Sequence, residues 1–406
     1  MTEVTTLAER EPADEVRALS ALAFGELGGF VSGIGQFHRG VAGRVFWALG
    51  PLGVVARTAH DGISRATYAG LRGGAGAIGR GADSVLALRP VPAERVISST
   101  PIGAAAVAAL NGLIGDTLER EGSDLAQPMA VRVDGSVVDP APEQMAAAFP
   151  GATGRIVVFL HGLMETELSW RGVYGDALAE QLGYTPVYVR FNTGRRVSEN
   201  GRTLAELLDD VAAAWPVDIE RIALVGHSMG GLVARSACHR AGLDERPWVR
   251  HVRHVVSLGT PHMGAPLEQA VHYASAGLHR LPETRPIATF LRRRSGGIRD
   301  LRQGSLVDED WRDCDPDALR AAACQEVPLL EGATHCFVSA TVTRSPRHPV
   351  GRLLGDVLVL VPSASGRSRT RRLGFRDEDG MHLGNASHFA LLHHPKVYEK
   401  LRAWLR

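Results

Sequence analysis

The sequence has few cysteines, no excess of either charge and no long uninterrupted apolar run, and each absence excludes a class of protein. Four cysteines, all after residue 237, are too few and too late for the disulfide framework of a small secreted protein, although a loop bridge between Cys314 and Cys324 stays open. Lys and Arg total 45 and Asp and Glu 44, so the net charge of +1 gives no overall attraction to nucleic acid. Arg or Asp interrupts every apolar stretch before it reaches about 18 residues, which argues against a membrane span.

The start of the chain lacks the features of an export signal. Residues 1–11 are acidic where a signal peptide would be basic, and no apolar core or cleavage site follows. We therefore expect a cytoplasmic location, with membrane association as the alternative. The 16 histidines are spread along the chain without the spacing of metal ligands, so we expect neither a metal nor another cofactor.

Residues 1–20 are predicted to be a polar tail, and residues 21–130 a helical extension rich in glycine and arginine. Apolar residues such as Val41, Val45 and Leu49 recur at helical spacing, and eight arginines outnumber four acidic residues between positions 21 and 96. One interpretation is a helical layer packed on the enzyme domain or on an oligomer partner. The other is a peripheral contact with a membrane or lipid surface.

From about residue 150 to residue 406 the pattern changes to short apolar strands separated by helices. β-Branched runs occupy 156–160, 185–190, 222–225 and 252–258, and helix-length stretches between and after them include 175–182, 203–215 and 230–241. This alternation predicts an α/β fold with a doubly wound, mostly parallel sheet covered on both faces. A helix at 101–120 and a hairpin at 131–138 are expected before it.

The most specific motif is Gly-His-Ser-Met-Gly-Gly at 226–231, which follows a predicted strand and opens a predicted helix. Glycines on either side of Ser228 allow a tight strand-to-helix turn that exposes the hydroxyl group. We therefore predict that Ser228 is a nucleophile. A residue adjacent to it on the strand points away, which argues against His227 as the base.

Two backbone amides are predicted to form an oxyanion hole. Leu163 follows the turn that Gly162 permits at the end of the first strong strand, and Met229 directly follows the nucleophile. His161, beside them, is expected to be a supporting residue that hydrogen-bonds nearby groups.

Three motifs together resemble the α/β-hydrolase superfamily, in its lipase-like branch. They are Leu-His-Gly-Leu at 160–163, the serine motif at 226–231, and Leu-Gly-Thr-Pro-His-Met-Gly at 258–264. The third is similar to lipases and to the GPI inositol-deacylase-like group that acts on glycolipids. The resemblance covers residues 150–406 and implies a serine esterase with the α/β-hydrolase fold.

The order of the family, serine then acid then histidine, places both partners after Ser228. Asp356 follows a predicted strand at 336–342 and resembles the acid of lipases, with Asp300 and Asp379 as substitutes. His388 lies in a loop of small residues before a C-terminal helix and is the expected base. The competing histidines are His382, His393 and His394.

Residues 262–335 are predicted to be a cap over the site, since they fit neither a strand nor a sheet-covering helix and relatives carry their cap here. An apolar cap helix near His272, Tyr273 and Leu278 would suit an acyl chain, and Arg292–Arg294 would meet an anionic head group or lie on a solvated loop. The expected function is hydrolysis of carboxylic, lipid-like esters through an acyl-enzyme. The alternatives are acyl transfer on the same site, or a lipid- or polymer-surface binding protein with an inactive hydrolase domain. Oligomers are compatible with each.

Overall fold

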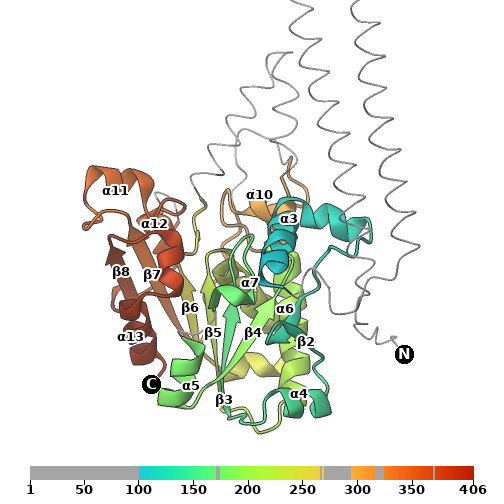
Figure 1. The fold of residues 1–406 in the computed structure, drawn as a ribbon. Coiled ribbons are helices and arrows are strands. Elements are labelled where there is room, and N and C mark those ends of the chain that lie inside the picture. The colour runs from blue at the N-terminus through green and yellow to red at the C-terminus, as the bar shows by residue number, and fades with distance from the viewer. Residues whose placement is uncertain (1–99, 171–173, 266–267, 269–293, 316–323, 369–370) are drawn as a thin grey trace, which may run out of the picture. The chain divides into compact units, whose positions relative to one another are not determined.

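The computed structural model describes residues 100–170, 174–265, 268, 294–315, 324–368 and 371–406 (Figure 1). The chain divides into two compact units, and the one described in detail below comprises residues 101–121, 126–269 and 295–406. The predicted tail at 1–20, the extension up to residue 99 and the cap residues His272, Tyr273 and Leu278 lie outside the described residues.

An eight-stranded sheet forms the centre of this unit, with the strand order β2-β1-β4-β3-β5-β6-β7-β8. Strands β3 to β8 pair in parallel, while β1 is antiparallel to both β2 and β4. The strands are β1 (Ala130–Val133), β2 (Ser136–Val138), β3 (Arg155–Leu160), β4 (Thr185–Arg190), β5 (Arg221–His227), β6 (Val252–Leu258), β7 (Thr334–Thr341) and β8 (Gly380–Gly384). The predicted doubly wound, mostly parallel sheet is confirmed.

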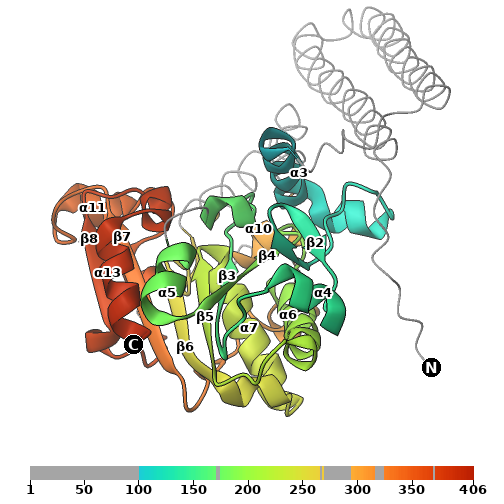
Figure 2. The same ribbon diagram turned by 60° about the horizontal axis from the view of Figure 1, so that its bottom comes forward.

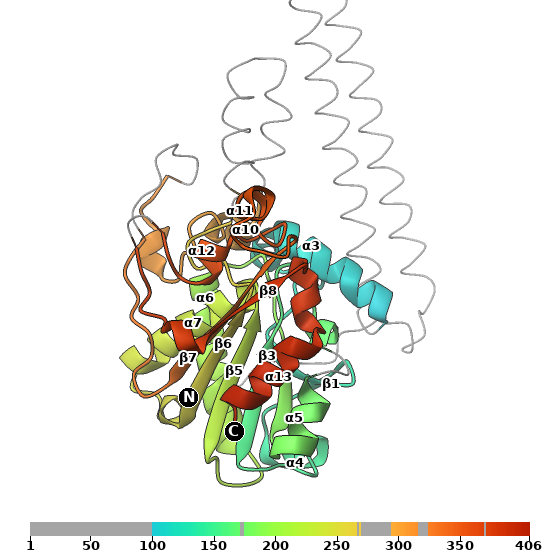
Figure 3. The ribbon, with the colours of Figure 1, turned by 90° about the vertical axis from the view of Figure 1, so that its left-hand side faces the viewer.

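Helices cover both faces of the sheet. Figure 3 shows α6 (Val197–Ala214) and α7 (Met229–Leu243) on one side of it and α5 (Gly175–Leu182) and α13 (Pro395–Trp404) on the other. Figure 2 shows α5 and α13 in front of the strands. The other α-helices in the part of the chain that the structure describes are α3 (Pro101–Arg120), α4 (Pro142–Ala148), α10 (Gly296–Asp300), α11 (Pro349–Leu354) and α12 (Val361–Ala364). Short 3-10 helices occupy Glu167–Trp170, Pro247–His251, Asp308–Asp310, Asp377–Asp379 and His388–Leu392.

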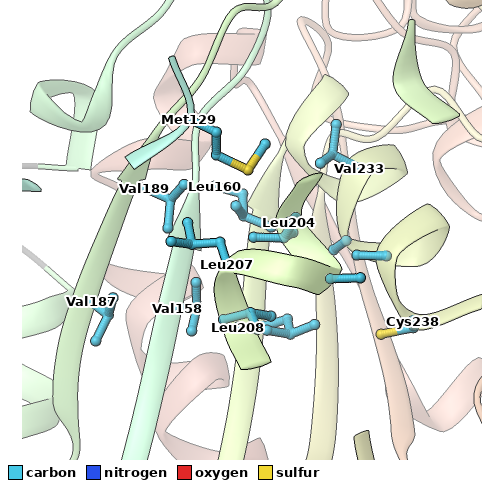
Figure 4. Close-up of a cluster of buried hydrophobic side chains, with 14 of the residues drawn as sticks. Met129, Val158, Leu160, Val187, Val189, Leu204, Leu207, Leu208, Val233 and Cys238 are labelled. Atoms are coloured by element: carbon cyan, nitrogen blue, oxygen red, sulfur yellow. The ribbon is translucent and has the colours of Figure 1, made fainter. Parts of the chain in front are cut away.

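Successive side chains along each strand point to opposite faces of the sheet, and the core is therefore divided into two clusters. Val158 and Leu160 of β3 face α6 and α7, where they meet Leu204 and Val233 (Figure 4). Val157 and Phe159 of the same strand face the opposite cluster, which includes residues of α5 and α13. Complete burial of such a side chain contributes about 1.5–3 kcal/mol, so both layers fix the positions of the strand ends.

Helix α3 is the one helix among the described residues that is long and apolar enough to cross a membrane, and 44% of its most apolar window is buried in the structure. As expected, Asp116 interrupts this stretch, although its small apolar residues keep the mean hydropathy high. One face of α3 packs close to the sheet. A Cβ on Gly112 would lie 2.3 Å from Cγ of Met164, and the Gly115 carbonyl accepts a hydrogen bond of 2.9 Å from the Asn192 side chain.

Candidate active site

The candidate site lies at the carboxyl ends of the parallel strands. Strand β3 pairs with β4 on one side and β5 on the other, so the direction of winding reverses at β3. Ligands in open α/β sheets bind outside such a reversal. The predicted nucleophile follows β5, and the predicted oxyanion-hole loop follows β3.

Ser228 occupies a strained turn between β5 and α7. Its backbone has φ 52° and ψ −119°, values that a residue with a side chain rarely adopts. The turn is tight because Gly226 and Gly230 are nearly in contact: a Cβ on Gly226 would lie 2.4 Å from the carbonyl carbon of Gly230. The predicted strand, serine turn and helix are therefore all present.

The loop after β3 passes directly over Ser228. A Cβ on Gly162 would lie 3.0 Å from Cβ of Ser228, which is closer than most such contacts, so a larger residue would push the loop away from the serine. The amide of Met229 is the first of α7 and has no acceptor within that helix. Among the described residues, no acceptor is found for the amide of Leu163 either. Both predicted oxyanion donors are thus located near the serine without a competing bond.

Asp356 and His388 form a buried pair. Oδ2 of Asp356 lies 2.8 Å from Nδ1 of His388, and the two side chains are 1% and 2% exposed. Oδ1 of the aspartate accepts hydrogen bonds from the amides of Leu358 and Val359 at 3.0 and 2.8 Å, and the His388 amide donates to the Asp356 carbonyl. The carboxylate is therefore fixed on one side by backbone and on the other by the imidazole.

The second imidazole nitrogen is left available. Nε2 of His388 has no hydrogen-bond partner among the described residues. Because Nδ1 donates to the aspartate, Nε2 carries the lone pair that could accept a proton.

The two aspartates considered as substitutes for Asp356 lie in other surroundings. Asp300 pairs with Arg196 at 2.6 Å and accepts the amide of Val197. Asp379 immediately precedes β8 and so lies at the opposite edge of the sheet, where it contacts Arg376.

The competing histidines are also engaged elsewhere. His382 contacts the hydroxyl groups of Ser339 and Thr341. His394 accepts the amide of Lys396 at the start of α13, and His393 is the residue before it. The structure therefore brings Asp356 and His388 together and leaves the alternatives apart.

Two further residues near the site were not assigned a role from the sequence. Glu165 lies 2.9 Å from Nδ1 of His227 and also accepts the amide of Gly162 at 2.8 Å. The other nitrogen of His227 lies 3.2 Å from the carbonyl of His388. Glu165 is 62 residues from His227 in the chain, so no local pattern could reveal the pair.

The pKa values of both partners shift in the direction that favours a charged pair. Burial alone would raise the pKa of Glu165, but the charge and hydrogen bond of His227 outweigh it and hold the pKa below its ordinary value. Burial alone would lower the pKa of His227, but Glu165 outweighs it and raises that pKa. An imidazolium with two N–H groups can donate to both the Glu165 carboxylate and the His388 carbonyl.

His161 acts as expected of a supporting residue. Its Nε2 accepts the amide of Phe191 at 3.1 Å, so its Nδ1 carries the proton and donates to the Gly162 carbonyl at 2.9 Å. Burial is the main cause that lowers its pKa, which keeps the ring neutral in this arrangement. His161 therefore helps to fix the loop over Ser228.

The described residues contain no group of three or more His, Cys, Asp or Glu side chains that could hold a metal ion. All four cysteines are free, so the bridge between Cys314 and Cys324 is absent.

Residues 151–276 match a family model described as the PGAP1-like alpha/beta domain. The match spans β3 to β6 and includes both the Gly162 loop and Ser228. Over these residues the chain is similar to that family. No curated protein sequence matches this chain significantly.

Several solved structures are similar to this chain. The mature form of the Bacillus licheniformis lipase BlEst2 is 19% identical over 62% of this chain and 91% of its own, with a TM-score of 0.42. The Aspergillus fumigatus lipase B is 13% identical over 60% of this chain and 50% of its own, with a TM-score of 0.36. The Staphylococcus hyicus lipase is 13% identical over 62% of this chain and 93% of its own, with a TM-score of 0.37.

Proposed function

We propose that this chain is an α/β hydrolase that cleaves carboxylic esters with lipid-like acyl groups, using Ser228 as nucleophile, His388 as base and Asp356 as the acid that orients it. The observation that supports this assignment most directly is the buried Asp356–His388 pair at 2.8 Å, at the same edge of the sheet as the strained Ser228 turn. A buried carboxylate that accepts from Nδ1 fixes the tautomer in which Nε2 can act as a base.

The proposed reaction has two steps. Nε2 of His388 takes the proton of the Ser228 hydroxyl, and its oxygen attacks the ester carbonyl carbon while the amides of Leu163 and Met229 donate to the oxyanion. The carbon–oxygen bond to the alcohol then breaks, and the alcohol leaves with the proton from His388. Water, deprotonated in the same way, attacks the acyl-enzyme and releases the acid.

The lipid-like class of the acyl group is supported by the resemblance of residues 258–264 to lipid esterases, and by the exposed apolar side chains beside the site that are described below. Transfer of the acyl group to an alcohol instead of water would use the same residues. Adding alcohols to the assay and analysing the products separates the two reactions.

The test is hydrolysis of p-nitrophenyl esters of increasing chain length, together with covalent labelling by a fluorophosphonate. Ser228→Ala is expected to lose labelling and to lose turnover by on the order of 10⁴–10⁶-fold. Ser136→Ala, a change of the same type at an exposed position on β2, serves as the matched control. Labelling that persists in Ser228→Ala would contradict the assignment of the nucleophile, and a wild type that neither labels nor turns over would favour a binding protein.

A further inference from the structure

Exposed apolar side chains gather on the two segments that carry Asp356 and His388. Leu353 is 75% exposed, Val357 60% and Phe389 57%, and Leu354 and Val350 are nearly half exposed. We call these five residues the apolar rim. Large apolar side chains in one region of a surface commonly mark a contact with lipid or protein.

The rim adjoins the proposed catalytic residues along the chain. Helix α11 ends two residues before Asp356, Val357 directly follows that residue, and Phe389 directly follows His388. The ring of Phe389 meets the ring of His388 edge-on, with 5.7 Å between the centroids. A surface that docks against the rim would therefore lie beside the two segments that carry the proposed acid and base.

Val357 adds a second observation. Its φ of 93° is a strained conformation for a β-branched residue, yet its side chain is exposed and packs into no core. The turn directs the amides of Leu358 and Val359 to Asp356, which explains the strain. This turn can orient the Asp356 carboxylate without an apolar side chain at position 357. The exposed valine there therefore indicates a contact outside the chain.

The charge around the rim is positive. Arg344, Arg347 and Arg352 are exposed, and none of them forms an ion pair with a described residue. No acidic residue occurs between positions 332 and 355. Apolar side chains flanked by unpaired cations are the composition that binds an interface with anionic lipids.

We infer that the apolar rim and its three arginines dock this hydrolase onto an anionic lipid surface, so that an ester enters the site directly from the lipid layer. The inference deepens the proposed function and rests on it. It differs from a lipid contact through residues 21–130, because it orients the proposed catalytic residues toward the layer.

The test uses the full chain with phosphatidylcholine vesicles that do or do not contain phosphatidylglycerol, and a long-chain ester dispersed in them. Leu353→Gln/Leu354→Gln is the rim variant, and Arg347→Gln/Arg352→Gln tests the charge. Leu243→Gln is the matched control, since Leu243 is 66% exposed at the far end of α7. Hydrolysis of a soluble short-chain ester is measured in parallel.

We expect both double variants to lose roughly tenfold or more of the turnover of the dispersed ester in phosphatidylglycerol vesicles, with turnover of the soluble ester unchanged. The control should match wild type in both assays. If the rim variant hydrolyses the dispersed ester as fast as wild type does, the inference is overturned, whatever amount of protein binds the vesicles. Light scattering gives the mass of each protein in solution. If the wild type is an oligomer and the rim variant is a monomer, the rim binds a second copy of the chain, and the inference is overturned. Failure of the proposed function is distinguishable, because it would remove soluble-ester turnover and fluorophosphonate labelling from the wild type.

Discussion

Glu165 and His227 form a buried ion pair that joins the loop over Ser228 to the segment that carries His388. The carboxylate accepts the amide of Gly162 at 2.8 Å, and the imidazolium lies 3.2 Å from the His388 carbonyl. The pair thus contacts the backbone of two loops that follow different strands, β3 and β8. Displacing either partner should shift the oxyanion donors and the base relative to one another.

Glu165→Gln should therefore lower kcat more than it raises KM. The variant should also change the pH dependence of stability. The lowered pKa of Glu165 contributes stability above the ordinary value of 4.5 that is lost as the pH falls through the folded pKa. The raised pKa of His227 contributes stability below the ordinary value of 6.5 that is lost as the pH rises through the folded pKa.

The difference in the free energy of unfolding between wild type and Glu165→Gln should accordingly be largest between pH 4.5 and 6.5 and shrink at both ends. Urea denaturation at several pH values measures it. Glu220→Gln, at a side chain that is 65% exposed, is the control and should show no such window. A difference that is flat with pH would contradict the charged pair.

Asp356→Asn should reduce kcat by about 10⁴-fold, because an amide can stabilise the wrong tautomer of His388. Asp379→Asn tests the alternative acid, which lies at the opposite edge of the sheet, and should retain activity. Steady-state hydrolysis of a soluble ester compares them. The reverse result would move the role of the acid to Asp379.

Gly259→Ala should displace His388. Gly259 has φ +60°, and an added Cβ would lie 3.0 Å from Cε1 of His388 and 2.8 Å from Cδ1 of Leu391. A shift of about 1 Å in a catalytic group can cost about 100-fold in rate. Gly183→Ala is the matched control, because its φ of +67° brings the same backbone strain and its Cβ would meet nothing within 4 Å. If Gly259→Ala and Gly183→Ala lose the same amount of stability and are equally active, His388 is not displaced by the added Cβ.

Arg190→Met should destabilise the fold by about 3–5 kcal/mol, because it leaves the Glu167 carboxylate buried without its partner. The two side chains are 1% and 5% exposed, and Nη2 of Arg190 lies 2.6 Å from Oε1 of Glu167. Arg155→Gln removes one partner of an exposed pair and should cost at most about 1 kcal/mol. Urea denaturation of both variants provides the comparison. The double variant Arg190→Met/Glu167→Leu should recover part of the loss, and a double variant no more stable than Arg190→Met would contradict this explanation.

The fold could be predicted from the sequence where local patterns determine it. The β-branched runs at 185–190 and 252–258 become β4 and β6 with the same bounds, because both strands pair with neighbouring strands on each side and their valines are buried. Strand β8 has the sequence Gly-Met-His-Leu-Gly, which contains no β-branched residue. It is a strand because it pairs with β7 and not because of its own sequence pattern. No pattern in the sequence indicated it.

The candidate site divides in the same way. Ser228 follows from a local motif, and the positions of Asp356 and His388 follow from the order of the superfamily; their catalytic roles stay predictions. Glu165 could not be assigned, because its partner is brought to it by the pairing of β3 with β5 and not by the neighbouring sequence.

The close approach of α3 to Met164 and Asn192 limits where this chain can be divided by engineering. A fragment that starts at the first strand would lack the wall on which the loop next to Ser228 rests. A fusion or an exchange of upstream segments should therefore leave residues 101–120 joined to the candidate site and place its boundary before α3.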